Sequence, residues 1–259
     1  MKYAIRYTEV AFNMEFDALQ VKIDLINWLQ HIFAINGPSC KAVIGISGGK
    51  DSTIAAALCV EALGKERVFG VLMPNGTQHD IAYSYEVVKH LGIAHYEINL
   101  KTPYDYIMSE VGKNMNVSNQ TQINLAPRLR MTTLYAVSQS VNGRVINTSN
   151  LSEIWVGYST RYGDSAGDFA PLAQLTVTEL KQLGHTLNLP IHLVDKTPED
   201  GLSGKSDEEK MGFSYAVLDA YIRTGKCDDL KAKARIDALH AQNEFKRLPM
   251  PIFPYKGAL

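Results

Sequence analysis

The stretch GISGGKDS, residues 45–52, ends the short apolar run KAVIGI and leads into STIAAALCVEAL, which has the pattern of a helix. Glycines directly after a strand let the main chain approach a phosphate closely, and the N–H groups at the start of a following helix favour an anion. A Walker A loop, Gly-x-x-x-x-Gly-Lys-Ser/Thr, has a serine or threonine directly after the lysine, whereas here Asp51 follows Lys50. The spacing from Gly45 to Gly49 is also one residue shorter than the spacing between the two glycines of that loop. The stretch therefore predicts a phosphate-binding loop of another kind, with a carboxylate where a kinase or GTPase has a hydroxyl.

The rest of the chain alternates between short apolar runs and helical patterns, as in an α/β protein. Apolar, β-branched runs predict strands at 42–46, 67–74, 94–100, 144–150 and 191–195. Helical periodicity predicts helices at 16–35, 52–63, 82–91, 104–111, 120–141, 152–159, 176–187, 213–222 and 228–246. We therefore predict a single domain over 1–259, built on a doubly wound parallel five-stranded sheet of order 3-2-1-4-5 with helices on both faces.

This strand order brings two distant loops together. Strands one and four are neighbours in it, and ligands bind beside the carboxyl ends of such a pair. SGGKDS follows strand one and NTSNLSE follows strand four, so Asp51 and Glu153 are expected to face each other. Two carboxylates with phosphate oxygens suit Mg²⁺. An alternative stays open, in which Asp51 or Ser52 caps a helix and Gly48 and Gly49 form a simple turn.

Composition limits the partners of the chain. The 259 residues carry a formal net charge of -1, so no basic field indicates a nucleic-acid partner. Cys40, Cys59 and Cys227 are far apart and show no metal-ligand spacing, which is typical of a reducing compartment. The N-terminal residues lack the apolar core of a signal peptide, and no apolar run is long enough to span a membrane. We expect a cytoplasmic protein without a membrane partner.

Several motifs resemble those of a known family. SGGKDS matches the SGGxDS signature of the PP-loop ATP pyrophosphatases, which split ATP between its α- and β-phosphates. LMPNGTQHD at 72–80, LAPRLRMTTLY at 125–135, NTSNLSEIWVGYSTRYGDSAGD at 147–168 and SDEEKMGFSYAVLDAYI at 206–222 follow in the order and spacing of the NAD+ synthetases. GYSTRYGDSAGD is similar to the GYFTKYGDGGxD of that family. The resemblance runs from about residue 15 to about residue 255.

The resemblance implies an activity and a set of site residues. Enzymes of this family use ATP and Mg²⁺ to adenylate the nicotinate carboxylate of deamido-NAD, and ammonia then displaces AMP. Carried over position by position, the residues expected around ATP are Gly45, Ile46, Ser47, Gly48, Gly49, Lys50, Asp51, Ser52 and Thr148. The catalytic metal ligands are expected to be Asp51 and Glu153. The residues expected to bind deamido-NAD or to close over the site are Arg128, Arg161, Asp168, Lys205, Asp207 and Lys246.

The chain departs from the family pattern at a few positions. Val177 stands where the family often has lysine, Glu199 stands near a common threonine, and Arg161 replaces a common lysine. A frequent His-Lys pair appears as Phe245-Lys246. These departures leave the ATP contacts of the last third of the chain open.

Alternative interpretations remain at this stage. Arg128 and Arg130 fit solvated helix charges as well, and Arg161 and Asp168 fit a mutual ion pair. The protein fits, less well, an RNA-modifying PP-loop enzyme or a nucleotide-binding module without catalysis. The family also implies a homodimer, which we expect to use the helical stretch 103–140. The synthetase-like pattern fills the chain after residue 44, and no cysteine has the setting of a glutaminase nucleophile. We therefore expect no glutaminase domain and free ammonia as the nitrogen source, unless a separate glutaminase subunit binds.

Overall fold

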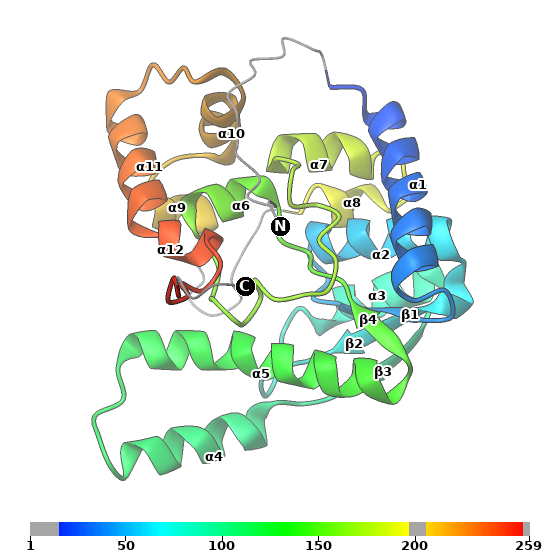
Figure 1. The fold of residues 1–259 in the computed structure, drawn as a ribbon, viewed down its shortest axis with the longest axis horizontal. Coiled ribbons are helices and arrows are strands. Elements are labelled where there is room, and N and C mark those ends of the chain that lie inside the picture. The colour runs from blue at the N-terminus through cyan, green and yellow to red at the C-terminus, as the bar shows by residue number, and fades with distance from the viewer. Residues whose placement is uncertain (1–15, 197–205, 256–259) are drawn as a thin grey trace.

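The computed structural model describes residues 16–196 and 206–255 and has an α/β fold around one parallel sheet (Figure 1). The strands are β1 (Lys41–Gly45), β2 (Val68–Leu72), β3 (Ala94–Glu97) and β4 (Gly143–Val145). Their order is β3-β2-β1-β4. The predicted order of the first four strands is confirmed. The carboxyl ends of β1 and β4 therefore lie side by side, as the topological argument requires.

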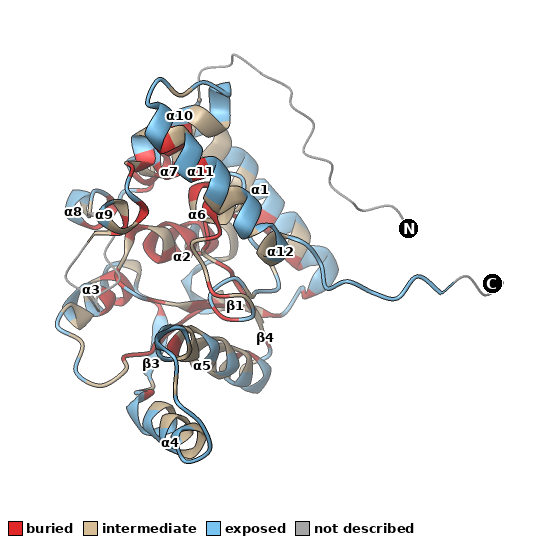
Figure 2. Ribbon diagram, turned by 90° about the vertical axis from the view of Figure 1, so that its left-hand side faces the viewer, coloured by how far each residue is buried: buried red, intermediate tan, exposed pale blue. Residues whose placement is uncertain are grey.

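Helices cover both faces of the sheet, unequally (Figure 2). One face carries α1 (Ala18–Asn36), α2 (Lys50–Leu63) and α3 (Ile81–Leu91), and the other carries α4 (Lys101–Gly112) and α5 (Asn119–Ser140). The side chains of β1 point alternately to the two faces of the sheet. Ala42 and Ile44 pack in the cluster under α2, while Val43 packs under α5. All three are fully buried.

The predicted fifth strand at 191–195 is wrong. These residues form the short helix α8 (Ile191–Val194), which begins after Pro190 and buries Leu193 and Val194 in the main core cluster. A short apolar run fits a buried helix as well as a strand, and only packing decides between them. Next to β4 the sheet continues with a single parallel bridge between Ile146 and Phe169.

A second layer of helices forms over α2. It is made of α6 (Leu151–Val156), α7 (Val177–Gly184), α9 (Asp207–Met211), α10 (Tyr215–Thr224), α11 (Leu230–Gln242) and α12 (Glu244–Arg247). The buried carboxylate of Asp219 ties three of them together, because it accepts hydrogen bonds from Ser152 on α6 and Thr178 on α7. A single 3-10 turn, Lys65–Arg67, precedes β2.

Among residues 16–196 and 206–255, we find no helix with the length and apolar character needed to cross a membrane.

Candidate active site

The loop between β1 and α2 has a backbone that only glycine fits at one position. Gly48 has φ +76°, and a Cβ there would lie 2.7 Å from Cβ of Tyr83 and 2.8 Å from the backbone nitrogen of Ser84. The loop ends at Gly49, the N-cap residue of α2, and no side chain of residues 16–196 or 206–255 caps that helix. The first N–H groups of α2 are therefore left for an anion.

Hydroxyl groups hold the loop in shape. The backbone N–H of Ser47 donates to Oγ of Ser52 (3.3 Å), and the N–H of Gly49 donates to Oγ of Ser47 (3.2 Å). Oγ of Ser52 donates in turn to the carbonyl of Gly49 (3.1 Å). Ser52 thus braces the loop from inside the first turn of α2, and the alternative in which it caps the helix is excluded. Ile46 is 3% exposed and packs in the main core cluster, and its backbone N–H donates to the carbonyl of Val71 (3.0 Å).

Lys50 is a buried cation beside the loop. Its side chain is 2% exposed, and Nζ lies 2.8 Å from Oδ2 of Asp51. Burial alone would lower the pKa of Lys50, but the carboxylates of Asp51, Glu153 and Asp207 outweigh burial and raise it. Lys50 is therefore charged, and it gathers three carboxylates from distant parts of the chain around the loop.

Asn150 joins the loop after β4 to the loop after β1. It is fully buried at the N-cap of α6, and its side-chain nitrogen donates to Oδ1 of Asp51 (3.4 Å). Its side-chain oxygen accepts from the backbone N–H of Glu153 (3.0 Å). One amide therefore joins the carboxylate of Asp51 to the first turn of α6, which carries Glu153, and the predicted meeting of the two loops is confirmed.

The electrostatics of Glu153 fit a bound divalent cation. Burial and the charge of Asp51 raise the pKa of Glu153 to about 8, although Lys50 pulls it down. Two acidic groups sharing a buried site repel each other unless a cation lies between them. Mg²⁺ is commonly held by one or two carboxylates plus phosphate oxygens and water, so Asp51 and Glu153 are sufficient protein ligands.

The structure adds two residues from the last third of the chain to this cluster. Asp207, the first residue of α9, is 7% exposed and accepts a hydrogen bond from Oη of Tyr158 (2.9 Å). Tyr215, the first residue of α10, is 3% exposed, and its ring centroid lies 5.9 Å from Nζ of Lys50. Asp207 thus lies with the acidic cluster, near Lys50 rather than near the two predicted arginines.

Arg128 and Arg161 form a second group, at the exposed end of the loop 157–168. Nε of Arg128 donates to the carbonyl of Arg161 (3.4 Å). The guanidinium of Arg161 lies over the rings of Tyr162 and Phe245, 5.0 and 5.7 Å from their centroids. Two departures from the family pattern, Arg161 and Phe245, therefore contact each other. A planar guanidinium stacks on a ring better than an ammonium does, which accounts for the pairing.

Asp168 and Lys246 are held by main-chain atoms. Oδ2 of Asp168 accepts from the N–H of Val145 on β4 (2.8 Å), so the alternative of an Arg161–Asp168 pair is excluded. Nζ of Lys246 donates to the carbonyls of Gly157 (2.7 Å) and Ser159 (2.9 Å). Both side chains line a cavity of about 220 Å³ under the loop 157–168.

Of the remaining residues named in the sequence analysis, Thr148 belongs to the described part of the chain and Lys205 and Glu199 do not. Thr148 is half-buried in the loop after β4, where its hydroxyl has no partner among the described residues. Lys205 and Glu199 lie outside the described residues. The ligand roles of Thr148 and Lys205 stay predictions, as do those of Arg128, Arg161, Asp168 and Lys246.

Sequence reasoning missed three residues of the site. Asn150 carries a usable signal, because asparagine three residues before Glu153 is a typical helix N-cap. Arg130, for which a solvated helix charge was one of two alternatives, is half-buried with Nε donating to the carbonyl of Met73 after β2 (3.4 Å), and burial lowers its pKa. Tyr215 carries no local signal, since nothing near it in the sequence points to Lys50.

Comparisons with known proteins agree with this geometry. Residues 22–250 match the NAD synthase family model. An NH(3)-dependent NAD(+) synthetase from Thermococcus sibiricus is 38% identical over 221 residues, 84% of this chain and 84% of that protein.

Solved structures give the same result. An NMN synthetase from Francisella tularensis is similar with a TM-score of 0.86 and 32% identity, over 93% of this chain and 100% of that chain. An NH3-dependent NAD synthetase from Campylobacter jejuni is similar with a TM-score of 0.75 and 28% identity, over 92% of this chain and 100% of that chain. The family that SGGKDS and GYSTRYGDSAGD predict is thereby confirmed. The chain belongs to the NAD synthase family.

Proposed function

We propose that this chain converts deamido-NAD to NAD+ with ATP and ammonia and releases AMP and pyrophosphate. The observation that carries the proposal is the contact of Asn150 with both Asp51 and the Glu153 backbone, because it brings two carboxylates to the phosphate-binding loop. A nucleotide-binding module without catalysis has no need of two acidic groups facing its phosphates. The named relatives support ammonia as the nitrogen source.

The reaction has two steps. A carboxylate oxygen of the substrate attacks the α-phosphorus of ATP, and the bond to the β-phosphate oxygen breaks. Ammonia then attacks the carboxyl carbon, AMP leaves with the former carboxylate oxygen, and the nitrogen loses a proton to give the amide. The N–H of Gly48, the first turn of α2 and Lys50 are placed to stabilise charge on the departing pyrophosphate. Mg²⁺ held by Asp51 and Glu153 would supply further positive charge to the phosphates.

The acidic substrate fits the arginines at 128 and 161. Deamido-NAD carries a pyrophosphate and a carboxylate, for which guanidinium groups are charge-assisted donors. The two arginines contact each other, and neither forms an ion pair with a carboxylate among the described residues, so both guanidinium groups are left for such a ligand.

Arg161→Ala is expected to raise the KM for deamido-NAD by about tenfold while the KM for ATP changes little, because a charge-assisted hydrogen bond contributes about 1.5–3 kcal/mol. Steady-state kinetics with each substrate varied in turn measures both constants. Arg235→Ala, an exposed arginine on α11, is the matched control. A larger rise in the KM for ATP would assign Arg161 to the nucleotide.

The direct test of the function is incubation of the chain with ATP, magnesium, ammonium and deamido-NAD, followed by chromatography for NAD+, AMP and pyrophosphate. An RNA-modifying enzyme would release AMP only with RNA present. A nucleotide-binding module would bind ATP in calorimetry and release nothing.

Ammonia is expected to support NAD+ formation, and glutamine is expected to support none. Cys59 is fully buried, and burial raises the pKa of its thiol to about 12, so it stays protonated. Cys227 lies in a turn with its thiol donating to the carbonyl of Asp229. The check is to supply ammonium or ammonia-free glutamine to the purified chain. Synthesis from glutamine that Cys227→Ser abolishes would contradict this expectation.

A second substrate is favoured by one observation. The similarity to the Francisella tularensis structure, an NMN synthetase, has the higher TM-score of the two reported above. The same chemistry on nicotinate mononucleotide would give NMN. The ratio of kcat/KM for the mononucleotide to that for deamido-NAD decides which substrate the site prefers. A ratio above one would assign the mononucleotide.

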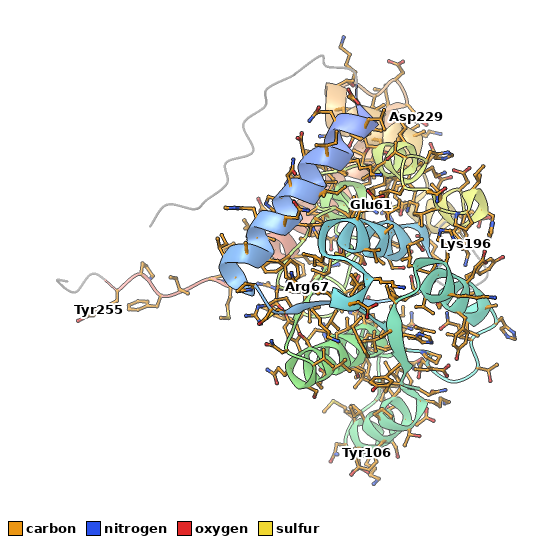
Figure 3. All side chains as sticks on the ribbon, turned by 90° about the vertical axis from the view of Figure 1, so that its right-hand side faces the viewer. Glu61, Arg67, Tyr106, Lys196, Asp229 and Tyr255 are labelled. Carbon is orange, nitrogen blue, oxygen red and sulfur yellow. The ribbon has the colours of Figure 1, made fainter. Side chains whose placement is uncertain are left out.

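We further propose a homodimer that uses α4 and α5. Tyr106 on α4, Met115 in the segment that joins α4 to α5 and Ile123 on α5 are exposed to 67%, 63% and 45%. In Figure 3, Tyr106 lies at the end of the molecule farthest from the second helix layer. Apolar side chains gathered on a projecting helix pair are typical of a protein interface. Light scattering on the wild type and on Tyr106→Glu tests the dimer.

A further inference from the structure

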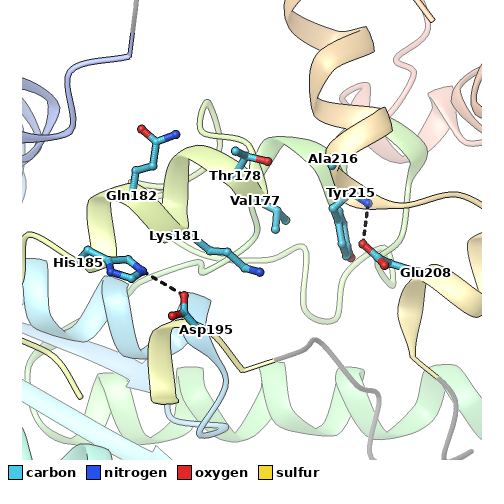
Figure 4. A pocket seen from close by; sticks show the side chains of 9 residues that line it. All are labelled: Val177, Thr178, Lys181, Gln182, His185, Asp195, Glu208, Tyr215 and Ala216. Carbon is cyan, nitrogen blue, oxygen red and sulfur yellow. Dashed lines mark hydrogen bonds and ion pairs between the residues drawn. The ribbon is translucent and has the colours of Figure 1, made fainter. Parts of the chain in front are cut away.

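The loop 157–168, which carries Arg161, packs against the short helix α12 near the C-terminus. The pocket of about 220 Å³ under this loop is lined in part by Lys246 and Arg247 of that helix. A larger pocket of about 790 Å³ has Tyr215 on its wall, beside the phosphate-binding loop (Figure 4). The two pockets share no lining residue. The support of the loop is therefore separate from the walls of the larger pocket.

Side chains near the C-terminus bind the carbonyl groups at the end of α6. The last carbonyls of a helix have no partner within it. Here Asn243, Lys246 and Arg247 donate to them, over distances of 2.7 to 3.1 Å. The acceptors are the carbonyls of Trp155, Val156, Gly157 and Ser159. We call residues 243–248 the clip, because they fasten the end of α6 and the start of the loop 157–168.

The clip also contacts the side chain of Arg161. The central guanidinium carbon lies 5.7 Å from the ring centroid of Phe245, and Nη2 lies 3.5 Å from the carbonyl oxygen of Leu248. The ring centroid of Tyr162 is 5.0 Å from the same carbon. Tyr162 has φ +59°, a conformation that costs energy for a residue with a side chain and persists where the surrounding structure requires it. Two rings and a carbonyl therefore fix where this cation lies.

The stack lies where a ligand can reach it. Phe245 and Tyr162 are 53% and 55% exposed. A long side chain loses rotamer freedom when a ligand orders it, and this loss weakens binding. A planar guanidinium held against a ring is already ordered, and it keeps N–H groups in its own plane for a phosphate or a carboxylate. Holding Arg161 in advance therefore favours the binding of an acidic ligand.

We propose that the clip positions the guanidinium of Arg161 through the ring of Phe245, so that the acidic substrate meets a cation that is already ordered. The inference rests on the proposed function, in which Arg161 binds deamido-NAD. Phe245 is a positioning residue in this arrangement, because it acts on Arg161 and does not touch the substrate. Its effect is expected on the binding of deamido-NAD and not on the binding of ATP.

Direct binding of deamido-NAD tests the proposal without turnover. Phe245→Leu is expected to raise the Kd for deamido-NAD about threefold, as for the loss of a cation–π contact near the surface, and to leave the Kd for ATP unchanged. Phe245→Tyr keeps the ring and is expected to bind as wild type. Phe253→Leu, which changes a phenylalanine that is 83% exposed and lies beyond the clip, is the matched control. Unchanged binding of deamido-NAD by Phe245→Leu would overturn the proposal.

A double variant separates positioning from direct contact. If Phe245 acts through Arg161, then Phe245→Leu is expected to have no further effect in a chain that already carries Arg161→Ala, because the two substitutions remove the same interaction and are not additive. A further threefold loss of affinity in that background would mean that Phe245 contacts the substrate itself, and it would overturn the proposal.

The order of the guanidinium is measurable without any substrate. In the ligand-free protein, Phe245→Leu is expected to lower the ¹H–¹⁵N NOE of the Arg161 Nε–H toward that of Arg235, an exposed arginine on α11. An unchanged NOE would overturn the proposal. If the wild type binds no deamido-NAD and forms no NAD+, the proposed function fails, and the NOE still decides whether Phe245 positions Arg161. If NAD+ forms but Phe245→Leu changes neither the Kd nor the NOE, this inference alone fails.

Discussion

Glu153→Gln is expected to lower the rate of NAD+ formation at least about tenfold while the fold is kept, because removal of one preorganised electrostatic group typically costs that much or more. Glu153 is a half-buried residue whose backbone N–H donates to the side chain of Asn150, which also contacts Asp51. Glutamine keeps its size and loses the negative charge that a divalent cation needs. Asp51→Asn should act in the same direction. Initial rates at limiting and saturating magnesium, with a melting curve for each variant, measure the effect.

Glu110→Gln is the control for that experiment. Glu110 is an exposed carboxylate on α4 that pairs with Lys113 at 2.6 Å, and its loss is expected to leave the rate unchanged. A Glu153→Gln variant that keeps the wild-type rate at limiting magnesium would remove Glu153 from the metal site. The same result for Asp51→Asn would remove Asp51.

Gly48→Ala is expected to have the larger effect, about a hundredfold in turnover, because a displacement of roughly 1 Å at reacting groups can cost that much. A Cβ at residue 48 would meet Cβ of Tyr83 and the backbone of Ser84 at under 3 Å, so the loop must move. The positive φ adds strain of about 1–3 kcal/mol. Turnover and the free energy of unfolding are measured on the same preparation.

Gly212→Ala separates strain from displacement. Gly212 has a similar φ of +83°, but a Cβ there would have nothing within 4 Å. The variant is expected to lose stability of about 1–3 kcal/mol and to keep its turnover. Equal losses of turnover in the two variants would mean that strain alone is responsible, and that contact with α3 does not position the loop.

Local patterns were sufficient for the parts of the site that local backbone geometry controls. SGGKDS predicts a tight turn between a buried strand and a helix, and the structure has that turn with Gly48 at positive φ. The meeting of Asp51 with Glu153 follows from strand order, because right-handed crossovers leave few arrangements for such a sheet. The helix at 191–194 could not be separated from a strand, since a short apolar run fits either until it packs on α2.

The sequence by itself determined the phosphate-binding loop, the order of the first four strands and the family, because these depend on short-range backbone requirements and on general rules of chain connection. The tertiary structure alone decided which side chains complete the site. Asn150 reaches Asp51 across 99 positions, and Tyr215 covers Lys50 from a helix in the second layer. It also separated the carboxylates around Lys50 from the stack of Arg161 on Phe245. Such contacts arise from how helices pack over the sheet, and packing depends on shape and burial that no local spacing of residues encodes.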